Sequence, residues 1–368
     1  MRNTLVAVLG GGQLGRMLAL AGVPMGVRFR FLDPDPACPA RDVGELIVGA
    51  YDDEAALARL VRGATVATVE FENVPASAAR ALAGRVPFFP GEAALAAAQE
   101  RLSEKVLLQS LGIPTPRFAA VETRPGLDAA ARYCGLPAVL KTRRLGYDGK
   151  GQFVIRDAAG VQEAWDVLGG VPLILEQFVP FDREVSIIAV RAADGATAFY
   201  PLTQNRHARG ILRESIAPAP SITPRLQEQA ESYARLVLAR LSYVGVLAIE
   251  FFEQGGTLIA NEMACRVHNS GHWTIEGASC SQFENHVRAV LGLPLGSTAA
   301  LGHACMLNVI GAEPDERAIL AVPGARLHMY GKEPRPWRKL GHVTIVGADA
   351  AGAERGRAAM LPAIHAAD

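Results

Sequence analysis

The 368-residue sequence has no excess of charge of either sign. It contains 37 Lys and Arg residues and 37 Asp and Glu residues, so its formal net charge at pH 7 is zero. A protein that binds the phosphate backbone of a nucleic acid needs a basic surplus, so we expect no nucleic-acid partner. A neutral total does not exclude local clusters of basic residues.

Long apolar runs and paired cysteines are also missing. No stretch approaches the roughly 20 apolar residues of a membrane-spanning helix. The N-terminal run Leu5–Leu9 breaks at Gly10, which is too soon for the apolar region of a signal peptide. The five cysteines form no C-x-x-C pair, which disfavours a zinc ribbon or a disulfide framework and fits a reducing compartment. We therefore expect a cytoplasmic protein without a membrane partner.

The residues that are present are those of a folded protein with several domains. Hydrophobic residues make up 50% and charged residues 20% of the chain, which excludes general disorder. At roughly 150 residues per domain, the length indicates two or three domains. The first hundred residues alternate short apolar runs with helical patterns, as in Thr4–Leu9, Leu14–Ala21 and Val27–Leu32. This alternation predicts a parallel, doubly wound sheet.

The pattern changes after residue 100. A predicted helix over 100–111 ends at Gly112 and Pro114, and a segment rich in hairpins follows it. A long amphipathic helix is predicted over 223–241. Beyond residue 296, short strand-like pieces indicate a smaller β-rich part.

The segment Gly10–Gly15 contains the pattern G-x-G-x-x-G between a predicted strand and a predicted helix. Glycines at these positions let the backbone approach an anion at the N-terminus of the helix. Asp33 follows Gly15 at about the spacing of the ribose-binding acid in a dinucleotide site. The pattern fits an NAD-type site, a similar scaffold for another ligand, or glycines that serve packing alone.

A second glycine-rich segment, Thr142–Gln152, lies between two predicted strands, with Lys141 and Lys150 at its edges. Its spacing is not that of a Walker loop. It predicts a hairpin tip that could fold over a triphosphate, or alternatively a plain basic turn.

Two acids, Glu250 and Glu262, lie on the two strands of a predicted hairpin over 246–262. If the turn centres near Gly255, both side chains project from one face as diagonal neighbours. With Asn261 they would offer the oxygen ligands that Mg²⁺ prefers. A slip of one residue would put them on opposite faces, and a solvated sheet face is the alternative.

Polar and basic residues gather in two later segments. His268 and His272 lie in the loop 266–273, but no H-E-x-x-H pattern occurs, so a donor-rich loop for an anionic, hydroxylated substrate fits better than zinc. Four cations follow within eight residues: Lys332, Arg335, Arg338 and Lys339. These cations would suit a phosphate-binding site, or alternatively they could simply be exposed to solvent.

Taken in order, these segments resemble the N5-carboxyaminoimidazole ribonucleotide synthetase family, which are ATP-grasp ligases of purine biosynthesis. The resemblance is carried by Gly10–Met17, Glu70–Asn73, GYDGKGQ at 146–152, EQFVPFDREVS at 176–186, NEMACRVHNSGHWTIEG at 261–277 and Gly341–Thr344. It implies an ATP-grasp fold of mixed α/β and α+β class. Its parts would be a Rossmann-like N-terminal domain over 1–100, an ATP-grasp domain over 101–296 with a lid at about 115–180, and a small C-terminal β-rich module over 297–368.

The resemblance also implies an activity. ATP, bicarbonate and 5-aminoimidazole ribonucleotide would be converted through carboxyphosphate into ADP, phosphate and the N-carboxylated ribonucleotide. The enzyme would bind Mg²⁺, and members of the family are commonly homodimers. By motif position, the ATP site would comprise Arg101, Lys141, Gly146, Tyr147, Asp148, Gly149, Lys150, Gly151, Gln152, Glu176, Gln177, Phe178, Val179, Glu184, His207, Asn261 and Glu262.

The other implied roles concern the acceptor and the metal. The ribonucleotide would contact Gln13, Asn73, Arg266, His268, Asn269 and Lys332, with Arg338 or Lys339 on its phosphate. Tyr147, Asp148, Lys150 and Arg266 would be catalytic, and Glu250 and Glu262 would bind Mg²⁺.

Two positions depart from the family pattern. Cys265 stands where proline is more usual, and Trp337 stands where glycine is more usual. Because neither change removes a charged group, we expect altered loop rigidity with activity retained. Three other functions are weighed against this one: an NAD-dependent oxidoreductase, an ATP-grasp ligase that uses formate or biotin, and a non-catalytic nucleotide-binding regulator.

Overall fold

The computed structural model describes residues 4–146 and 150–364. Its N-terminal part is a parallel sheet of four strands in the order β3-β2-β1-β4, as the alternating pattern predicts. Val6 and Val8 of β1 pack toward α1, whereas Ala7 and Leu9 pack toward α2 and α3 on the opposite face. The elements are β1 (Leu5–Leu9), α1 (Gln13–Gly22), η1 (Val23–Met25), β2 (Arg28–Asp33), η2 (Pro39–Asp42), β3 (Glu45–Val48), α2 (Glu54–Leu60), β4 (Val66–Val69), α3 (Ala76–Ala83) and α4 (Glu92–Ala98).

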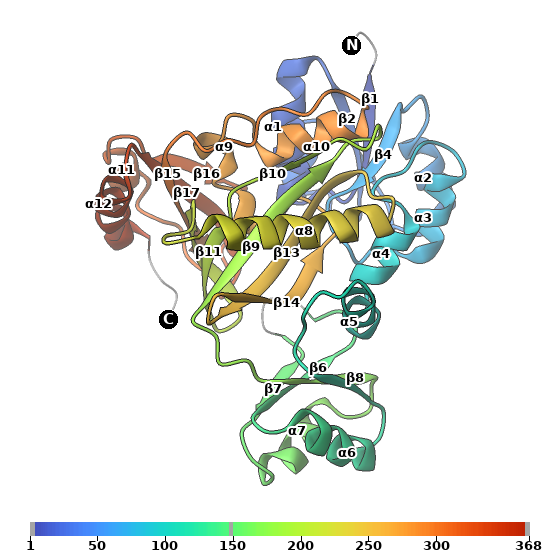
Figure 1. Ribbon diagram of the computed structural model, residues 1–368. Helices are drawn as coiled ribbons and strands as arrows, with labels where there is room; N and C mark the ends of the chain where they lie inside the picture. Colours follow the sequence, from blue (N-terminus) through green and yellow to red (C-terminus); the bar gives the residue numbers. More distant parts are fainter. Residues whose placement is uncertain (1–3, 147–149, 365–368) are drawn as a thin grey trace.

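A second sheet forms the part at the bottom of Figure 1, which we call the lid. Its antiparallel strands run in the order β5-β8-β6-β7. Leu127, Leu140 and Leu173 belong to a core cluster made only of lid residues, so the lid is packed as a unit of its own. Its elements are β5 (Phe118–Val121), α6 (Arg124–Cys134), β6 (Ala138–Thr142), β7 (Gln152–Ile155), α7 (Gly160–Leu168) and β8 (Leu173–Gln177), and α5 (Arg101–Ser110) precedes them.

The central sheet has nine strands in the order β14-β13-β9-β11-β12-β15-β17-β16, with β10 paired to β9. The helix α8 lies across one face of β9 and β13 (Figure 1). Because β15 pairs with β12, the strands beyond residue 296 continue this same sheet. Its elements are β9 (Arg183–Arg191), β10 (Thr197–Phe199), β11 (Thr203–Ala208), β12 (Ile211–Ala217), α8 (Pro224–Arg240), β13 (Gly245–Gln254), β14 (Thr257–Ala264), η3 (Asn269–Gly271), α9 (Thr274–Gly277), α10 (Gln282–Val290), β15 (His303–Ile310), α11 (Glu316–Leu320), β16 (Arg326–Met329), β17 (Lys339–Gly347), α12 (Ala350–Met360) and η4 (Leu361–Ala363).

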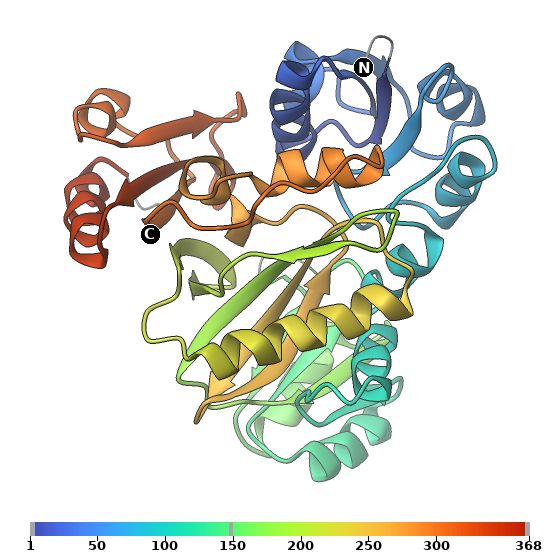
Figure 2. The same cartoon turned by 45° about the horizontal axis from the view of Figure 1, so that its top comes forward.

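The helix α10 joins the N-terminal part to the central sheet. Figure 2 shows α10 between the N-terminal elements and the central sheet. Phe283 and Val287 of α10 lie in one core cluster with Leu18 of α1 and Val190 of β9. This shared core fixes the N-terminal glycine-rich segment relative to β13 and β14. Among the described residues, no helix combines the length and the apolar character needed to span a membrane.

Candidate functional site

A cavity of about 1120 Å³ lies where the N-terminal part, the lid, the central sheet and the loop 331–339 meet. The residues expected from the sequence that line it are Gln13, Asn73, Arg101, Lys141, Gly146, Lys150, Gln152, Phe178, Glu184, His207, Glu250, Asn261, Glu262, Arg266, His268, Asn269, Lys332, Arg338 and Lys339. Gly151, Glu176, Gln177 and Val179 are not in its lining. Tyr147, Asp148 and Gly149 lie outside the described residues.

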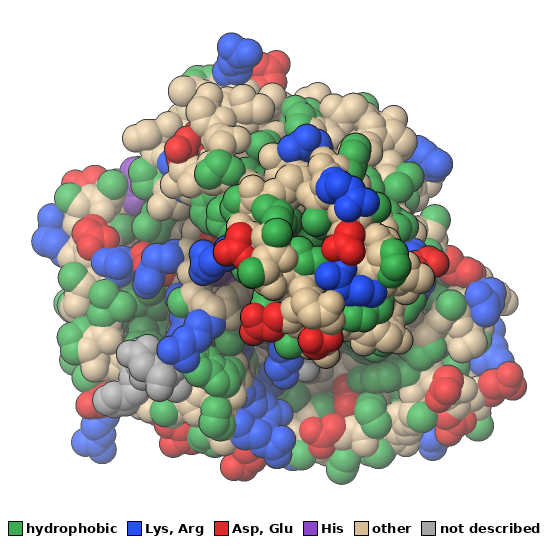
Figure 3. All heavy atoms as spheres, turned by 90° about the horizontal axis from the view of Figure 1, so that it is seen from below, with side chains coloured by type: hydrophobic (Ala, Val, Ile, Leu, Met, Phe, Trp, Pro, Cys, Tyr) green, Lys and Arg blue, Asp and Glu red, His purple; other side chains and the backbone are tan. Residues whose placement is uncertain are grey.

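The surface seen from the lid side carries both signs of charge. In Figure 3, Lys and Arg side chains are mixed with Asp and Glu side chains on this face, without a continuous basic area. This face of the molecule therefore offers no extended basic surface.

The N-terminal glycine-rich segment is filled by the protein's own carboxylates. The backbone amides of Gly12 and Gly15 donate hydrogen bonds to Glu70 at 2.8 and 3.1 Å, and that of Gly11 donates to Asp33 at 2.7 Å. A Cβ atom added to Gly12 would lie 2.4 Å from Glu70 Oε1. Burial raises the pKa of Glu70, and these amide hydrogen bonds oppose that shift. The glycines therefore serve an internal acid, and no pyrophosphate fits among them as an NAD-type site requires.

The hairpin of β13 and β14 brings Glu250 and Glu262 together, but in a different register from the one expected. The turn consists of Gly255 and Gly256, both with positive φ. A regular ladder from this turn would pair Glu250 with Asn261. A bulge at Asn261 shifts the register, so Glu250 lies directly opposite Glu262 instead of diagonally. The bulge thus places both carboxylates on one face, which the turn alone would not do.

Charged neighbours give the two hairpin acids different proton affinities. Arg101 Nη1 lies 2.9 Å from Glu262 Oε2. Although burial opposes the shift, this guanidinium holds the pKa of Glu262 below its ordinary value. Burial and the repulsion from Glu262 and Glu184 raise the pKa of Glu250, with His207 opposing the shift. Two acids that resist simultaneous ionisation in this way are well placed to bind a cation.

The residues around this pair fit Mg²⁺. Asn261 Oδ1 is buried and has no hydrogen-bond partner among the described residues. Within residues 4–146 and 150–364, no group of three or more His, Cys, Asp or Glu side chains is arranged to hold a metal ion. Magnesium commonly needs only one or two carboxylates, because substrate phosphates and waters complete its octahedron. Glu250, Glu262 and the unpaired amide oxygen match that requirement.

A buried ion cluster connects the lid to the hairpin. On β8 of the lid, Glu176 Oε2 lies 3.0 Å from Lys141 Nζ and 3.3 Å from Lys105 Nζ. Lys105 also donates hydrogen bonds to the carbonyl oxygens of Ala260 and Asn261 on β14. Although burial opposes the shift, Lys105 and Lys141 lower the pKa of Glu176 to about 2. Glu176 is thus held behind the cavity wall and carries charge at neutral pH.

The sequence analysis did not identify Glu104 or Lys105. Both are almost completely buried, at 2% and 1% exposure. Burial raises the pKa of Glu104 to about 8, and its carboxylate accepts a hydrogen bond from the amide of Met263. Their spacing of three and four residues after Arg101 puts them near its face of α5. This spacing from Arg101 was the one feature of the sequence that could have indicated these two residues.

His207 and Glu184 form an ion pair at the cavity wall. Nδ1 of His207 lies 2.9 Å from Oε2 of Glu184, on the adjacent strands β11 and β9. Although burial opposes the shift, the hydrogen bond from Glu184 raises the pKa of His207 to about 9. His207 is therefore a cation at neutral pH.

We expect this pair to make stability depend on pH. The pKa of His207 rises from an ordinary 6.5 to about 9 on folding, so its contribution is complete below pH 6.5 and is lost as pH rises through 9. His207→Gln should cost about 1–2 kcal/mol of unfolding free energy at neutral pH. Urea unfolding of both proteins from neutral pH to about pH 10 measures the difference, which should shrink at the alkaline end. A difference that is constant with pH would contradict the assignment.

The opposite end of the cavity holds the loop after β14. Arg266 forms a two-point ion pair with Glu72, with Nη2 to Oε1 at 3.1 Å. Burial and the charge of Arg266 lower the pKa of His268 to about 3, so His268 is neutral. Asn269 exchanges hydrogen bonds with Asn308 at 2.7 and 3.0 Å. The loop after β14 therefore offers neutral hydrogen-bond donors and acceptors from His268 and Asn269, beside Arg266, whose charge is balanced by Glu72.

Two further contacts lie near this end of the cavity. Lys332 donates a hydrogen bond to Gln13, which joins the loop 331–339 to the start of α1. Cys265 is fully buried, and its thiol donates to the carbonyl oxygen of Ala94 at 3.1 Å. Glu72, Asn308 and Arg143 were given no role in the sequence analysis. Glu72 lay in a quoted motif and Arg143 in the glycine-rich segment Thr142–Gln152, whereas Asn308 gave no signal beyond its polarity.

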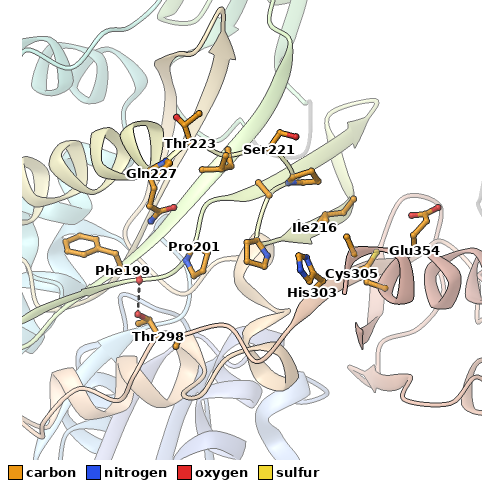
Figure 4. Close-up of a pocket in the computed structure, with 18 of the residues that line it drawn as sticks. Phe199, Pro201, Ile216, Ser221, Thr223, Gln227, Thr298, His303, Cys305 and Glu354 are labelled. Atoms are coloured by element: carbon orange, nitrogen blue, oxygen red, sulfur yellow. Dashed lines mark hydrogen bonds between the residues drawn. The ribbon is translucent and has the colours of Figure 1, made fainter. Parts of the chain in front are cut away.

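A second cavity, of about 830 Å³, lies between α8 and α12 (Figure 4). Phe199, Pro201 and Ile216 give its wall an apolar character, and Thr298 donates a hydrogen bond to the carbonyl oxygen of Phe199. Arg357, at its edge, is already paired with Glu214 and Glu354. In the part of the chain that the structure describes, no other Lys or Arg lines this cavity, whereas Lys and Arg side chains from several elements line the first one. A phosphate ligand, which needs cationic hydrogen-bond donors, therefore fits the first cavity better.

Three family models match successive parts of the chain. The ribonucleotide synthetase preATP-grasp domain matches residues 3–99, and the ATP-grasp domain matches residues 106–283. The phosphoribosylaminoimidazole carboxylase C-terminal domain matches residues 304–356. The matches follow the same order as the three parts implied by the sequence.

Known proteins match almost the whole chain. The N5-carboxyaminoimidazole ribonucleotide synthase of Pseudomonas aeruginosa is 57% identical over 346 residues, which covers 94% of this chain and 95% of the relative. The crystal structure of the Thermus thermophilus synthetase has a TM-score of 0.94 with 55% identity, covering 98% of both chains. An Aspergillus clavatus synthase, solved with ADP and 5-aminoimidazole ribonucleotide, has a TM-score of 0.91 with 30% identity and covers 99% of this chain and 98% of its own. With this extent of identity and a matching fold, the chain belongs to the N5-carboxyaminoimidazole ribonucleotide synthase family.

Proposed function

We propose that the chain is an ATP-dependent ligase that carboxylates 5-aminoimidazole ribonucleotide with bicarbonate. The observation that carries the proposal is one cavity lined by lid cations, the paired acids Glu250 and Glu262, and the donor-rich loop after β14. A nucleotide and a phosphorylated acceptor can meet in that space. Family membership supports the choice of acceptor.

The nucleotide would occupy the side of the cavity formed by the lid and the central sheet. Arg101, Lys141 and the segment 146–152 would contact the phosphates of ATP, and Glu184 would hold the ribose hydroxyls. The segment Glu176–Val179 would line the adenine pocket through backbone groups, with Gln177 and Phe178 between its ends. His207 would lie beside the nucleotide, where its positive charge is already balanced by Glu184.

Mg²⁺ would be held by Glu250 and Glu262, with Asn261 beside them. When bound, it would supply the positive charge that balances the phosphoryl group in transfer. Arg101 and Lys141 would add fixed cations at the same end of the cavity. Positioning and charge provide most of the catalysis in phosphoryl transfer.

The reaction proceeds in two parts. A bicarbonate oxygen attacks the γ-phosphorus of ATP, which gives carboxyphosphate and ADP. Carboxyphosphate then breaks down to carbon dioxide and phosphate, and the exocyclic amine of the ribonucleotide attacks the carbon and releases a proton. Closing the lid would exclude water, which would otherwise hydrolyse the intermediate. Tyr147, Asp148, Lys150 and Arg266 are the proposed catalytic residues.

The acceptor would bind at the end formed by the N-terminal part and the loop 331–339. Arg266, His268 and Asn269 would contact the ribonucleotide, and Gln13 and Asn73 would reach it from the N-terminal part. Lys332 and one of Arg338 and Lys339 would bind its phosphate. All of these side chains line the cavity.

The remaining expectations belong to the same proposal. We infer a cytoplasmic homodimer whose chain divides at about residues 100 and 296, with the lid at about 115–180. Light scattering in solution measures the dimer, and a mass of one chain would contradict it. Limited proteolysis with and without ATP tests whether the lid is a separately protected unit.

The activity is tested by following ADP release while each substrate is omitted in turn. We expect magnesium-dependent ATP turnover that needs 5-aminoimidazole ribonucleotide, with the carbamate formed only when bicarbonate is present. Full turnover without the ribonucleotide would contradict the proposal. Stimulation by formate or biotin instead would select another ATP-grasp ligase, and binding of NAD without binding of ATP would select an oxidoreductase.

A further inference from the structure

The segment Arg335–Arg338 is a tight turn with an unfavourable residue in it. The amide of Arg338 donates to the carbonyl oxygen of Arg335 at 3.0 Å, and Trp337 has a φ of +66°. A proline at the second position and a positive φ at the third position are typical of a type II turn, and the third position of such a turn favours glycine. Trp337 therefore holds a strained backbone conformation, which needs compensation from its surroundings.

A second turn with a positive φ contacts the ring of Trp337. Arg209 has a φ of +53° at the tip of the hairpin between β11 and β12, and Gly210 follows it with a φ of +76°. The guanidinium carbon of Arg209 lies 4.7 Å from the centre of the Trp337 ring, within the range of a cation–π contact. Arg213, on β12, lies 5.8 Å from the same centre.

This contact lies at the edge of the cavity. Arg209 is exposed and Trp337 is half-buried, and both line the cavity together with Pro336 and Arg338. The contact thus joins a hairpin of the central sheet to the loop that carries the proposed phosphate cations.

We propose that Trp337 is a positioning residue for the phosphate of the ribonucleotide. Its ring, held by Arg209, fixes the turn 335–338 so that Arg338 and Lys339 are directed at a phosphate monoester. This inference rests on the function proposed above, because it names the residue that orders one end of that site. It accounts for a residue that is unfavourable for the turn by itself.

One substitution, Trp337→Gly, should keep or raise the stability of the fold and at the same time weaken binding of the ribonucleotide. Trp337→Gly relieves the positive φ, so its melting temperature should stay equal or rise. The KM for the ribonucleotide should nevertheless rise about tenfold, while kcat and the KM for ATP stay within about twofold. A residue with a purely structural role would not weaken binding of one substrate while stabilising the fold.

Two further variants separate the ring from the backbone. Trp337→Phe keeps an aromatic face and should recover most of the affinity. Arg209→Met keeps the length of the side chain and should raise the KM as Trp337→Gly does, and the double variant should be no worse than either single one. Arg240→Met, at an exposed position on α8 outside the cavity, is the matched control and should behave as the wild type.

A substrate without the phosphate provides the sharpest measurement. With the 5-aminoimidazole ribonucleoside as the substrate, the KM should be the same for the wild type and Trp337→Gly. An unchanged KM for the ribonucleotide in Trp337→Gly, or equal rises for both acceptors, would overturn the inference. If the wild type itself shows no turnover that depends on the ribonucleotide, the proposed function fails instead, which is a separate result.

Discussion

Glu262→Gln should abolish ATP turnover while leaving the fold intact. The change removes one of two carboxylates that face each other on the hairpin of β13 and β14, beside the unpaired amide oxygen of Asn261. These three groups form the proposed magnesium site. Loss of one of the two proposed magnesium ligands should reduce kcat by about 10³-fold or more. ADP release titrated with magnesium measures this loss, and excess metal should restore little of it.

The same change should have little effect on stability. The side chain of Glu262 is 40% exposed and pairs with Arg101 at the cavity surface, so the loss should be within about 1 kcal/mol. Glu253→Gln is the matched control, since Glu253 lies on the same hairpin and pairs with Arg183 outside the cavity lining. Full activity in Glu262→Gln, or equal loss in both variants, would refute the assignment to magnesium.

Lys105→Met should give the largest loss of stability. Lys105 is 1% exposed and pairs with Glu176 across the junction between α5 and the lid. Methionine matches the length of the side chain but removes one of the two lysines that balance the buried charge of Glu176, and only Lys141 remains beside it. Breaking a buried ion pair from one side costs about 3–5 kcal/mol. Urea unfolding measures this value, and the KM for ATP should rise at least about tenfold because Glu176 begins the segment that we propose to form the adenine pocket.

A double variant tests whether charge causes that loss. Glu176→Gln removes the buried acid that pairs with Lys105 at 3.3 Å, so the attraction between the two charges is already absent in each single variant. The double variant should therefore lose less stability than the sum of the two single losses. Simple addition of the two losses would show that packing, and not charge, explains the effect.

The sequence predicts much of the fold because its periodic patterns are local. The parallel N-terminal sheet, the hairpin of β13 and β14 and the helix α8 all follow from patterns within a few residues of one another. The face of the hairpin acids does not follow from them. It depends on one bulge at Asn261, which no pattern in the sequence indicates.

The site was also only partly predictable, for a similar reason. Its charged residues could be named from motifs, but their partners come from distant segments. Glu176 on β8 is balanced by Lys105 from α5, and Arg266 is balanced by Glu72 from a different domain. Since these pairings form only on folding, the order of residues along the chain carries no direct sign of them.

The acid that fills the N-terminal glycine loop has a consequence for recognising such domains. Gly12 and Gly15 bind Glu70, which follows the fourth strand and not the second. An acid immediately after that strand can therefore distinguish a loop that carries its own anion from one that is open to a dinucleotide. A glycine fingerprint accompanied by this distant acid would count against cofactor binding. Where this acid is absent, the glycine fingerprint indicates a dinucleotide site, as it usually does.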